Sequence, residues 1–401
     1  MDVQIINRIN THYYYYYCIY YLKREDFFRR IPMKFTCQQQ TLMKALNTVS
    51  KAVSAKTTIP TLKGILIETA GDSLVLTASD LDLSIRTRIE ASVEEEGSAV
   101  VTAKLLSDIV RKLPNEELTL FDEGVNINIK TLSSEFKVIC MPVEEFPEVY
   151  KKEDVNDTLV FNRELFMDMV RKTAFAASMD ESKGVLTGIL TEVSPDSISM
   201  VAIDGFRLAY VREEARGERD KKFIVSARIM NDIRKIISDE DEECDVIVSF
   251  GAKKTTFSIG NTIVIIRLME GEFLDYNNII PKDSFTRAVI GREVLLESIE
   301  RASLLAREGK NNLIRMSIVN NLLTITSRSD EGNVKEEIVI EKDGNDIEIG
   351  FNSKYVLDVL KAIDDEEVQF NFKSGVDPAI VTSVNGDEYK YLILPVRITS
   401  I

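Results

Sequence analysis

A ten-residue pattern occurs three times along this chain, at intervals of 124 and 126 residues. Each copy begins with Thr, Ser or Asn, which commonly cap helices, and continues with apolar residues at helical spacing. The copies are Thr102–Arg111, Ser226–Lys235 and Asn352–Lys361. A period of this length is that of a domain rather than of a solenoid repeat, so the pattern predicts three similar domains.

Each copy is preceded by a second predicted helix, over 37–53, 162–178 and 291–307. Runs rich in Val, Ile and Thr, separated by turn residues, predict strands over 64–69, 73–78, 126–129, 263–268 and 322–326. Long antiparallel meanders with two helices on one face make an α+β domain. Polar segments near 148–157 and 281–285 are the predicted linkers, which gives domains at 33–153, 157–284 and 285–401.

The first 32 residues differ from the rest in composition. Seven of the thirteen tyrosines and the only histidine, His12, lie before residue 22, where no helical or strand period can be traced. This segment could be an aromatic, basic arm for nucleic acid or a membrane surface. We interpret it instead as a non-native or disordered extension ahead of a start at Met33, because Arg29 and Arg30 stand where a translated ribosome-binding site would lie.

Composition restricts the class of protein. No apolar run reaches the ~20 residues of a membrane helix, so we expect a cytoplasmic protein with no membrane partner. The four cysteines, at 18, 37, 140 and 244, fit no Cys-x-x-Cys spacing and predict reduced thiols. From Met33 onward there is no histidine, which removes His-based catalysis and His metal sites. We expect no cofactor.

The charge is unevenly distributed. The whole chain carries a net charge of -15, which would ordinarily argue against binding to phosphates. Six windows around the predicted helices nevertheless contain 17 basic and 8 acidic residues, within a body that has 45 basic and 62 acidic ones; the windows are 37–56, 103–113, 162–178, 226–237, 291–307 and 353–363. Lys104, Arg228 and Lys354 all fall in the first turn of a helix, where the macrodipole disfavours a cation. Basic helix surfaces are often only solvated, but this threefold recurrence favours sequence-independent phosphate contact.

Helix geometry then predicts the number of subunits. Helices ~10 Å across leave a hole of ~9 Å when six surround it and ~28 Å when twelve do. The smaller hole is narrower than the ~12 Å major groove alone. Six helices per chain therefore predict a closed head-to-tail dimer around duplex DNA.

Four stretches, in all three repeats, closely match one known family: Met33–Thr36, Ala202–Ala209, Gly350–Leu360 and Leu394–Arg397. In these stretches the chain resembles the bacterial DNA polymerase III beta subunit, or sliding clamp, family. The resemblance implies three clamp domains that form half of a closed ring. It implies as partners duplex DNA, a second copy, a clamp loader, replicative and translesion DNA polymerases, and mismatch-repair proteins.

The resemblance also implies a pocket for partner peptides between the second and third domains. Such a cleft would be apolar with two guanidinium donors, suited to Leu or Phe anchors and a Gln. Phe206, beside it, stands where the family usually has His. The pocket positions are Ile203, Gly205, Arg207, Leu208, Leu274, Ile279, Pro378, Leu392, Leu394, Val396 and Arg397.

Family contacts with DNA match Lys56 and Lys183, and subunit-interface positions match Phe136, Val138, Leu304 and Leu305. The interface side chains could equally belong to domain cores. With the helix positions, the candidate DNA contacts are Lys44, Lys51, Lys56, Lys104, Arg111, Arg171, Lys172, Lys183, Arg228, Arg234, Lys354 and Lys361.

The competing hypothesis is a metal-dependent nuclease or phosphatase that uses Asp80, Asp82 and Asp204. Paired carboxylates can hold two metal ions for phosphoryl chemistry. The first two of these acids, however, fall in a predicted turn, and the chain lacks a Gly-x-x-x-x-Gly-Lys loop. We therefore favour a tether without catalytic residues.

Overall fold

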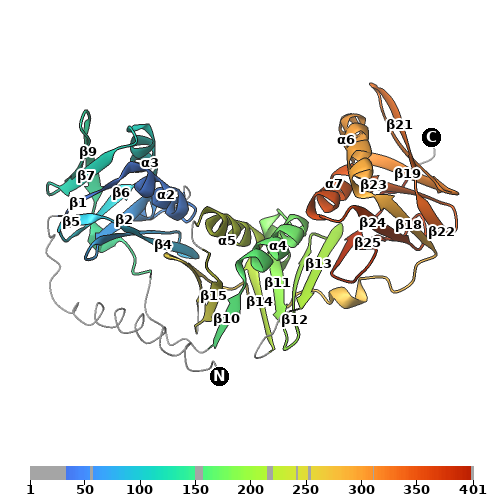
Figure 1. Cartoon of the computed structure of the whole chain (residues 1–401), viewed down its shortest axis with the longest axis horizontal. Coiled ribbons are helices and arrows are strands. Elements are labelled where there is room, and N and C mark those ends of the chain that lie inside the picture. Colours follow the sequence, from blue (N-terminus) through green and yellow to red (C-terminus); the bar gives the residue numbers. More distant parts are fainter. Residues whose placement is uncertain are drawn as a thin grey trace. The chain divides into compact units, whose positions relative to one another are not determined.

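The computed structural model describes residues 33–54, 57–149, 157–214, 220–240, 243–251, 254–309 and 311–398. They form two compact units. One contains residues up to 148 except 81–85, and the other contains 81–85 and the residues from 149 onward. The first unit holds one copy of the repeat and the second holds two (Figure 1).

All three copies share one order of elements: strand, helix, four strands, helix, three strands. The first copy has β1 (Lys34–Gln38), α2 (Gln39–Ser50), β2 (Gly64–Thr69), β3 (Ser73–Ser79), β4 (Leu83–Glu90), β6 (Ser98–Thr102), α3 (Ala103–Lys112), β7 (Glu117–Asp122), β8 (Asn126–Lys130) and β9 (Glu135–Met141). The second has β10 (Asp157–Phe161), α4 (Arg163–Thr173), β11 (Gly188–Val193), β12 (Ser197–Ile203), β13 (Arg207–Glu214), β14 (Lys221–Ser226), α5 (Ala227–Asp239), β15 (Val246–Phe250), β16 (Thr255–Ile259) and β17 (Thr262–Ile266).

The third copy has β18 (Thr286–Gly291), α6 (Arg292–Glu308), β19 (Leu313–Val319), β20 (Leu322–Ser329), β21 (Gly332–Val339), β23 (Ile347–Asn352), α7 (Ser353–Ala362), β24 (Glu367–Phe372), β25 (Ala379–Thr382) and β26 (Tyr389–Ile393). Short extra strands are β5 (Ser92–Glu95) and β22 (Glu341–Gly344). The predicted α+β class and the predicted strands are therefore confirmed.

Within each copy the strands form two four-stranded antiparallel groups with the same order. In the third copy these are β18-β24-β25-β26 and β23-β19-β20-β21. The second copy has β10-β15-β16-β17 and β14-β11-β12-β13, and the first has β1-β7-β8-β9 and β6-β2-β3-β4. The repeat seen in the sequence is thus a repeat of strand topology.

Apolar spacing explains where the helices lie, but two predictions about their ends are wrong. In α3 the buried Leu106, Ile109 and Val110 share one face. The helix predicted over 37–53 begins only at Gln39, because Cys37 still pairs with Leu118 in the sheet. Of the three predicted caps only Asn352 bonds a helix N–H, that of Lys354 at 3.0 Å, whereas Thr102 and Ser226 cap nothing.

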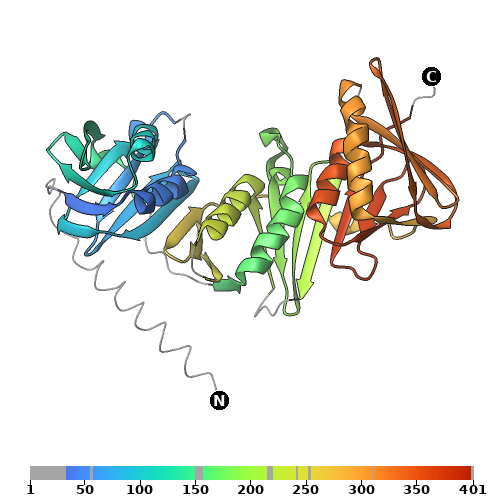
Figure 2. The same ribbon diagram turned by 45° about the horizontal axis from the view of Figure 1, so that its top comes forward.

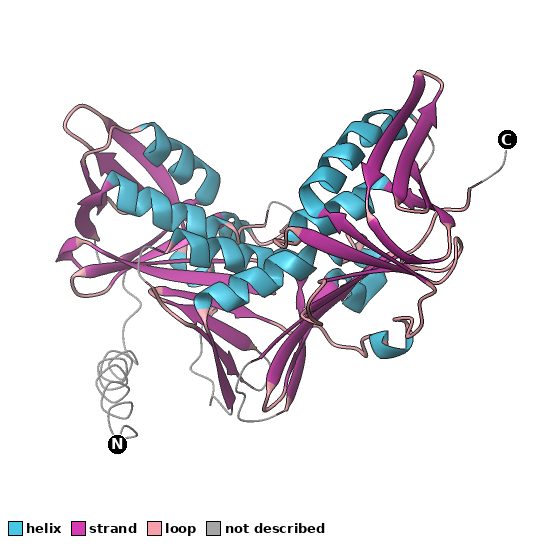
Figure 3. Cartoon of the chain, turned by 45° about the vertical axis from the view of Figure 1, so that its right-hand side comes forward, coloured by secondary structure: helices cyan, strands magenta, loops and turns pink. Residues whose placement is uncertain are grey.

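The second unit contains one continuous nine-stranded sheet, because β13 pairs with β26 in antiparallel register from Arg207–Ile393 to Val211–Tyr389. Its helices form a row, in which α5 packs on α4, α4 on α7 and α7 on α6 (Figures 1 and 2). In the first unit α2 packs on α3. Figure 3 shows the helices in cyan against the magenta strands of the sheets.

Candidate functional site

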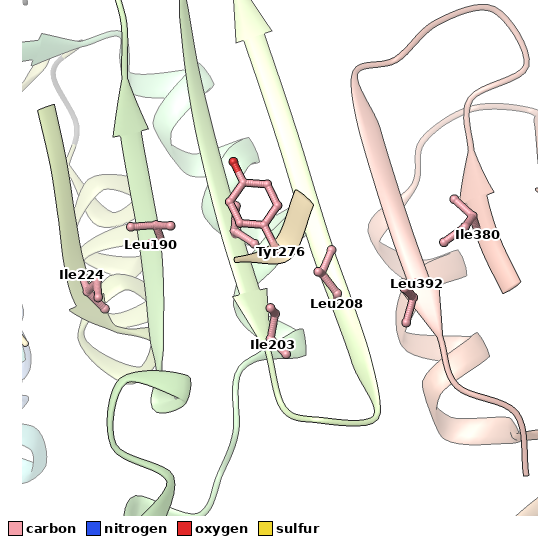
Figure 4. Packing of buried hydrophobic residues seen from close by; sticks show 8 residues of the cluster. Leu190, Ile203, Leu208, Ile224, Tyr276, Ile380 and Leu392 are labelled. Carbon is pink, nitrogen blue, oxygen red and sulfur yellow. The ribbon is translucent and has the colours of Figure 1, made fainter. Parts of the chain in front are cut away.

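A buried apolar cluster lies where β13 joins β26, and we call it the junction cluster (Figure 4). Leu208 lies opposite Leu392, and Ile380 of β25 lies opposite Leu392 on its other side. The buried members are Leu190, Val201, Ile203, Leu208, Ile224, Tyr276, Ile380 and Leu392, and packed against them are the partly buried Val185, Leu186, Tyr210, Met269, Phe273, Ile280 and Leu394. Such a border of partly buried apolar side chains is suited to receiving the anchors of a peptide.

Four of the predicted pocket residues meet in this cluster. Ile203, Leu208 and Leu392 are at most 4% exposed and form its floor, whereas Leu394 is partly buried at its edge. The backbone N–H of Leu394 donates to the carbonyl of Phe206 at 2.9 Å, which holds the end of β26 beside the β12–β13 turn. That turn needs Gly205, whose φ is +94°.

The other predicted pocket residues lie outside the junction cluster. Leu274 and Ile279 are 47% and 40% exposed, on either side of the 3-10 turn Tyr276–Asn278. Pro378 precedes β25, and Val396 donates its N–H to the carbonyl of Gly350. Arg397 is exposed. None of these five is among the residues that make up the cluster.

Sequence reasoning missed several members of the junction cluster. Leu190, Val201 and Ile224 lie directly across neighbouring strands from one another, on the same face as Ile203 and Leu208. The strands are buried on both faces, so a period of two marks them as strands but does not separate these residues from the domain core. Tyr276, Phe273 and Ile280 belong to a segment without a repeating period, so only the folded chain brings them to the sheet.

Arg207 is not the free guanidinium that we expected. Its side chain is 8% exposed and bonds to Asp204 at 3.0 Å, Asp358 at 2.5 Å and the Phe175 carbonyl at 2.6 Å. The guanidinium also lies 4.7 Å from the ring centroid of Tyr355. Because Asp358 and Tyr355 are on α7, Arg207 ties the second copy of the repeat to the third.

Phe206, next to this network, is 58% exposed. Its ring stacks on that of Tyr355 with centroids 6.1 Å apart and planes inclined by 22°. Tyr355 therefore contacts both the exposed ring of Phe206 and the guanidinium of Arg207, while the Phe206 carbonyl accepts the N–H of Leu394 at the rim of the junction cluster.

The side chains of two predicted DNA contacts also form ion pairs within the protein. Arg171 pairs with Asp168 and Asp364 and donates to the Ala362 carbonyl at 3.2 Å, while Lys172 pairs with Asp168 at 2.5 Å and is 16% exposed. Burial raises the pKa of Asp168, but hydrogen bonds from Lys172 and Arg171 outweigh it and keep this pKa below its usual value. Arg171 and Lys172 stay candidate DNA contacts whose charges are engaged in ion pairs within the chain.

The remaining basic candidates are placed as follows. Lys104, Lys183, Arg228 and Lys354 are exposed, and Lys44 and Lys51 are partly exposed on α2 and just beyond it. Arg111 pairs with Asp108 at 3.3 Å, Lys361 pairs with Glu300 at 2.8 Å, and Arg234 is half-buried. Thr48 of α2 is buried and donates to the Lys44 carbonyl. Lys56 lies outside the described residues.

The predicted interface residues divide into two kinds. Phe136 is 39% exposed on β9 and Leu304 is 63% exposed on α6, with Leu305 half-buried beside it. Val138 is 5% exposed, because it points into the core of its own sheet opposite Ile127. The exposed apolar neighbour on that strand is Ile139, at 74%.

Comparison with known proteins identifies the family. Models of the N-terminal, central and C-terminal domains of the DNA polymerase III beta subunit match residues 33–150, 161–275 and 277–397. The chain belongs to the DNA polymerase III beta subunit family. It is a sliding-clamp processivity factor built of three clamp domains.

Relatives match this chain over nearly their whole length. The beta sliding clamp of Bacillus subtilis is 32% identical over 380 residues, covering 91% of this chain and all of the relative, and that of Staphylococcus epidermidis is 33% identical over 377 residues, covering 91% and 99%. The crystal structure of the Bacillus subtilis sliding clamp superimposes with a TM-score of 0.86 at 31% identity, covering 92% of this chain and all of that one. Among the described residues no helix has the length and apolar character to cross a membrane.

Replacing Arg207 with Ala should destabilise the second unit. The change leaves Asp204 and Asp358 without their cation, and breaking a buried pair in this way costs about 3–5 kcal/mol. Urea denaturation followed by circular dichroism measures the loss. As a control, Arg287→Ala, at an exposed arginine on β18, should change stability by at most about 0.5 kcal/mol. Equal stability of the two variants would show that Arg207 does not hold the junction.

Proposed function

We propose that two copies of this chain close head to tail into a ring around duplex DNA and tether DNA polymerases to it without doing chemistry. The observation that carries the proposal is a pair of strand edges that lack a neighbour. Along Glu135–Ile139, β9 pairs only with β8 among the described strands, and β21 pairs only with β20.

These two edges are equivalent, by the repeat, to two strands that are already paired. β21 occupies in the third copy the place of β13 in the second, and β9 occupies in the first copy the place of β26 in the third. β13 and β26 pair within the chain. By analogy, we expect the β21 edge of one subunit to pair with the β9 edge of another. This contact is heterologous, so it generates a ring when the rotation closes.

Exposed apolar side chains accompany both edges. Phe136 and Ile139 lie on β9, Val339 is 83% exposed on β21, and Leu304 is exposed on α6, which packs on β21. Exposed edge strands with apolar side chains are sites of association unless they are covered. We therefore assign Phe136, Ile139, Leu304, Leu305 and Val339 to the subunit interface.

Replacing Leu304 with Asp should convert the dimer into monomers with an unchanged fold, because the charge would be desolvated at the interface. Light scattering coupled to size-exclusion chromatography measures the mass. The matched control is Val294→Asp, which places the same charge at a residue 54% exposed on the same helix. Dimers of both variants, or monomers of both, would contradict this assignment.

The exposed basic residues of the helices support sequence-independent contact with DNA. Lys104, Arg228 and Lys354 occupy the first turns of α3, α5 and α7, and all three are exposed. Phosphate contacts position a protein on DNA without reading its bases. A lumen lined by the helices of two subunits leaves ~28 Å for the duplex.

A topological experiment tests the ring directly. Protein that a clamp loader has placed on a nicked circular plasmid should stay bound through gel filtration and should be lost once the plasmid is cut to a linear form. The reason is that a ring is retained by the closure of the DNA and not by affinity for it. Similar retention on circular and linear plasmid would contradict encirclement.

The enzymatic alternative finds less support. Asp204 accepts hydrogen bonds from the backbone N–H groups of Phe206 and Arg207 and from the Arg207 guanidinium, so it serves the β12–β13 turn. Within the described residues, no group of three His, Cys, Asp or Glu side chains is arranged to hold a metal ion. A role as a tether needs no such group.

The junction cluster is the proposed docking site for partner peptides of polymerases, the clamp loader and mismatch-repair proteins. Leu394→Glu should lower the affinity for a Gln-Leu-Phe type peptide at least about tenfold, because a carboxylate at the rim would be desolvated by the apolar anchor. Fluorescence anisotropy measures the affinity. Val376→Glu, at a residue 79% exposed and outside the cluster, is the control and should bind normally. Unchanged affinity of the Leu394 variant would refute the assignment.

A further inference from the structure

One face of the central sheet changes from apolar to charged, row by row. Ile203 and Leu208 face each other across β12 and β13 at one end, and the next row is Ile224, Leu190, Val201 and Tyr210. The row after that is Lys222, Glu192, Ser199 and Arg212. Because residues two apart along a strand share a face, the apolar floor of the junction cluster continues directly into the charged row.

An open cleft of about 470 Å³ lies over the charged row. Three basic and two acidic side chains line it together with the hydroxyls of Ser194, Ser197 and Ser199. Tyr210 and Tyr276 also line this cleft, and both contact the junction cluster. The cleft and the cluster are therefore neighbouring parts of one surface.

Tyr276 connects the two parts. Its ring packs in the junction cluster, 5.7 Å from the Tyr210 ring centroid, while its hydroxyl donates to the Glu192 carboxylate. In Figure 4 the oxygen of Tyr276 points away from Ile203 and Leu208. A segment bound on the cluster would pass along this side chain to reach the charged row.

Of the charged side chains in this row, Arg212 has no ion-pair partner among the described residues. Lys222 pairs with Glu192; burial raises the pKa of Glu192, but its bonds from Lys222 and Tyr276 hold that pKa below the usual value, so it remains an anion. Lys221 pairs with Asp157 at 3.2 Å. Arg212 is exposed and forms no ion pair with another described residue. With Asp157 counted beside the lining acids Glu192 and Asp220, the three basic groups are balanced in number, so the feature that distinguishes Arg212 is its exposure without an ion pair among the described residues.

We propose that the peptide docked on the junction cluster extends past Tyr276 and places an acidic side chain on Arg212. The inference rests on the proposed docking function and adds a charge preference to it. Leu208 and Arg212 are four residues apart on β13, so an extended peptide would carry its carboxylate about four residues from its apolar anchor.

The test uses the full chain and labelled Gln-Leu-Phe type peptides, extended at one end or the other, with Asp or Asn four residues from the anchor. At one end the Asp peptide should bind about two- to five-fold more tightly than the Asn peptide, as expected for an exposed ion pair. The preference should weaken in 0.5 M salt, because exposed charges are then screened within about 4–5 Å. It should vanish in Arg212→Gln and reverse in Arg212→Glu.

Arg287→Gln, at an exposed arginine four strands further along the same sheet, is the charge-matched control and should keep the preference. Equal binding of Asp and Asn peptides at both ends, or an equal effect of the two arginine variants, overturns the inference while the docking site stands. Failure of the unextended peptide to bind overturns the docking site and this inference together. Loss of retention on nicked plasmid by Arg212→Glu with unchanged peptide preference would assign Arg212 to DNA and overturn the proposal.

Discussion

The pairing of β13 with β26 is the contact on which the second unit depends. It joins two copies of the repeat into one sheet, sets Leu208 against Leu392, and thereby builds the floor of the junction cluster. Strand pairing alone would fix register but not the position of the helices. Arg207 supplies that second constraint, because its bonds reach Asp204 beside its own strand and Asp358 on α7.

A buried arginine of this kind is costly unless every donor is satisfied. Each nitrogen of the Arg207 guanidinium donates one hydrogen bond, to two carboxylates and a backbone carbonyl in all, and the group lies over the rings of Phe175 and Tyr355, so much of its desolvation is compensated. Arg171 repeats the arrangement at the other side of the junction, between Asp168 and Asp364. Arg171 of α4 also donates to the carbonyl of Ala362, the last residue of α7, and so links these two neighbouring helices of the row.

The sequence predicted the features that depend on residues close together in the chain, and it did not predict those that depend on residues far apart in it. Helices and strands depend on local period, and the strand predicted over 64–69 has these bounds in the structure. The pocket depended on pairing between residues nearly two hundred positions apart, so Leu208 and Leu392 were found through family resemblance and not through periodicity. The ion pairs of Arg207 and Arg171 could not be predicted, because a sequence shows an arginine but not the carboxylates that fold against it. For Val138 the sequence left both an interface and a core position open, and the alternation of β9 turns it inward and Ile139 outward.

The repeat also explains why an interface can be inferred from a single chain. The edge of β13 is paired within the chain, whereas the equivalent edge of β21 has no neighbour among the described strands and is therefore open to another subunit. Natural sheets usually protect free edges with charge, and β9 does carry Glu135 and Lys137, which face solvent. Between these charges stands Phe136, with Ile139 beyond, an apolar pair that an edge meant to stay free would avoid. The charges on this edge disfavour pairing with unrelated strands, whereas the apolar side chains stabilise contact with a partner of matching shape. This combination favours a specific ring over open-ended association.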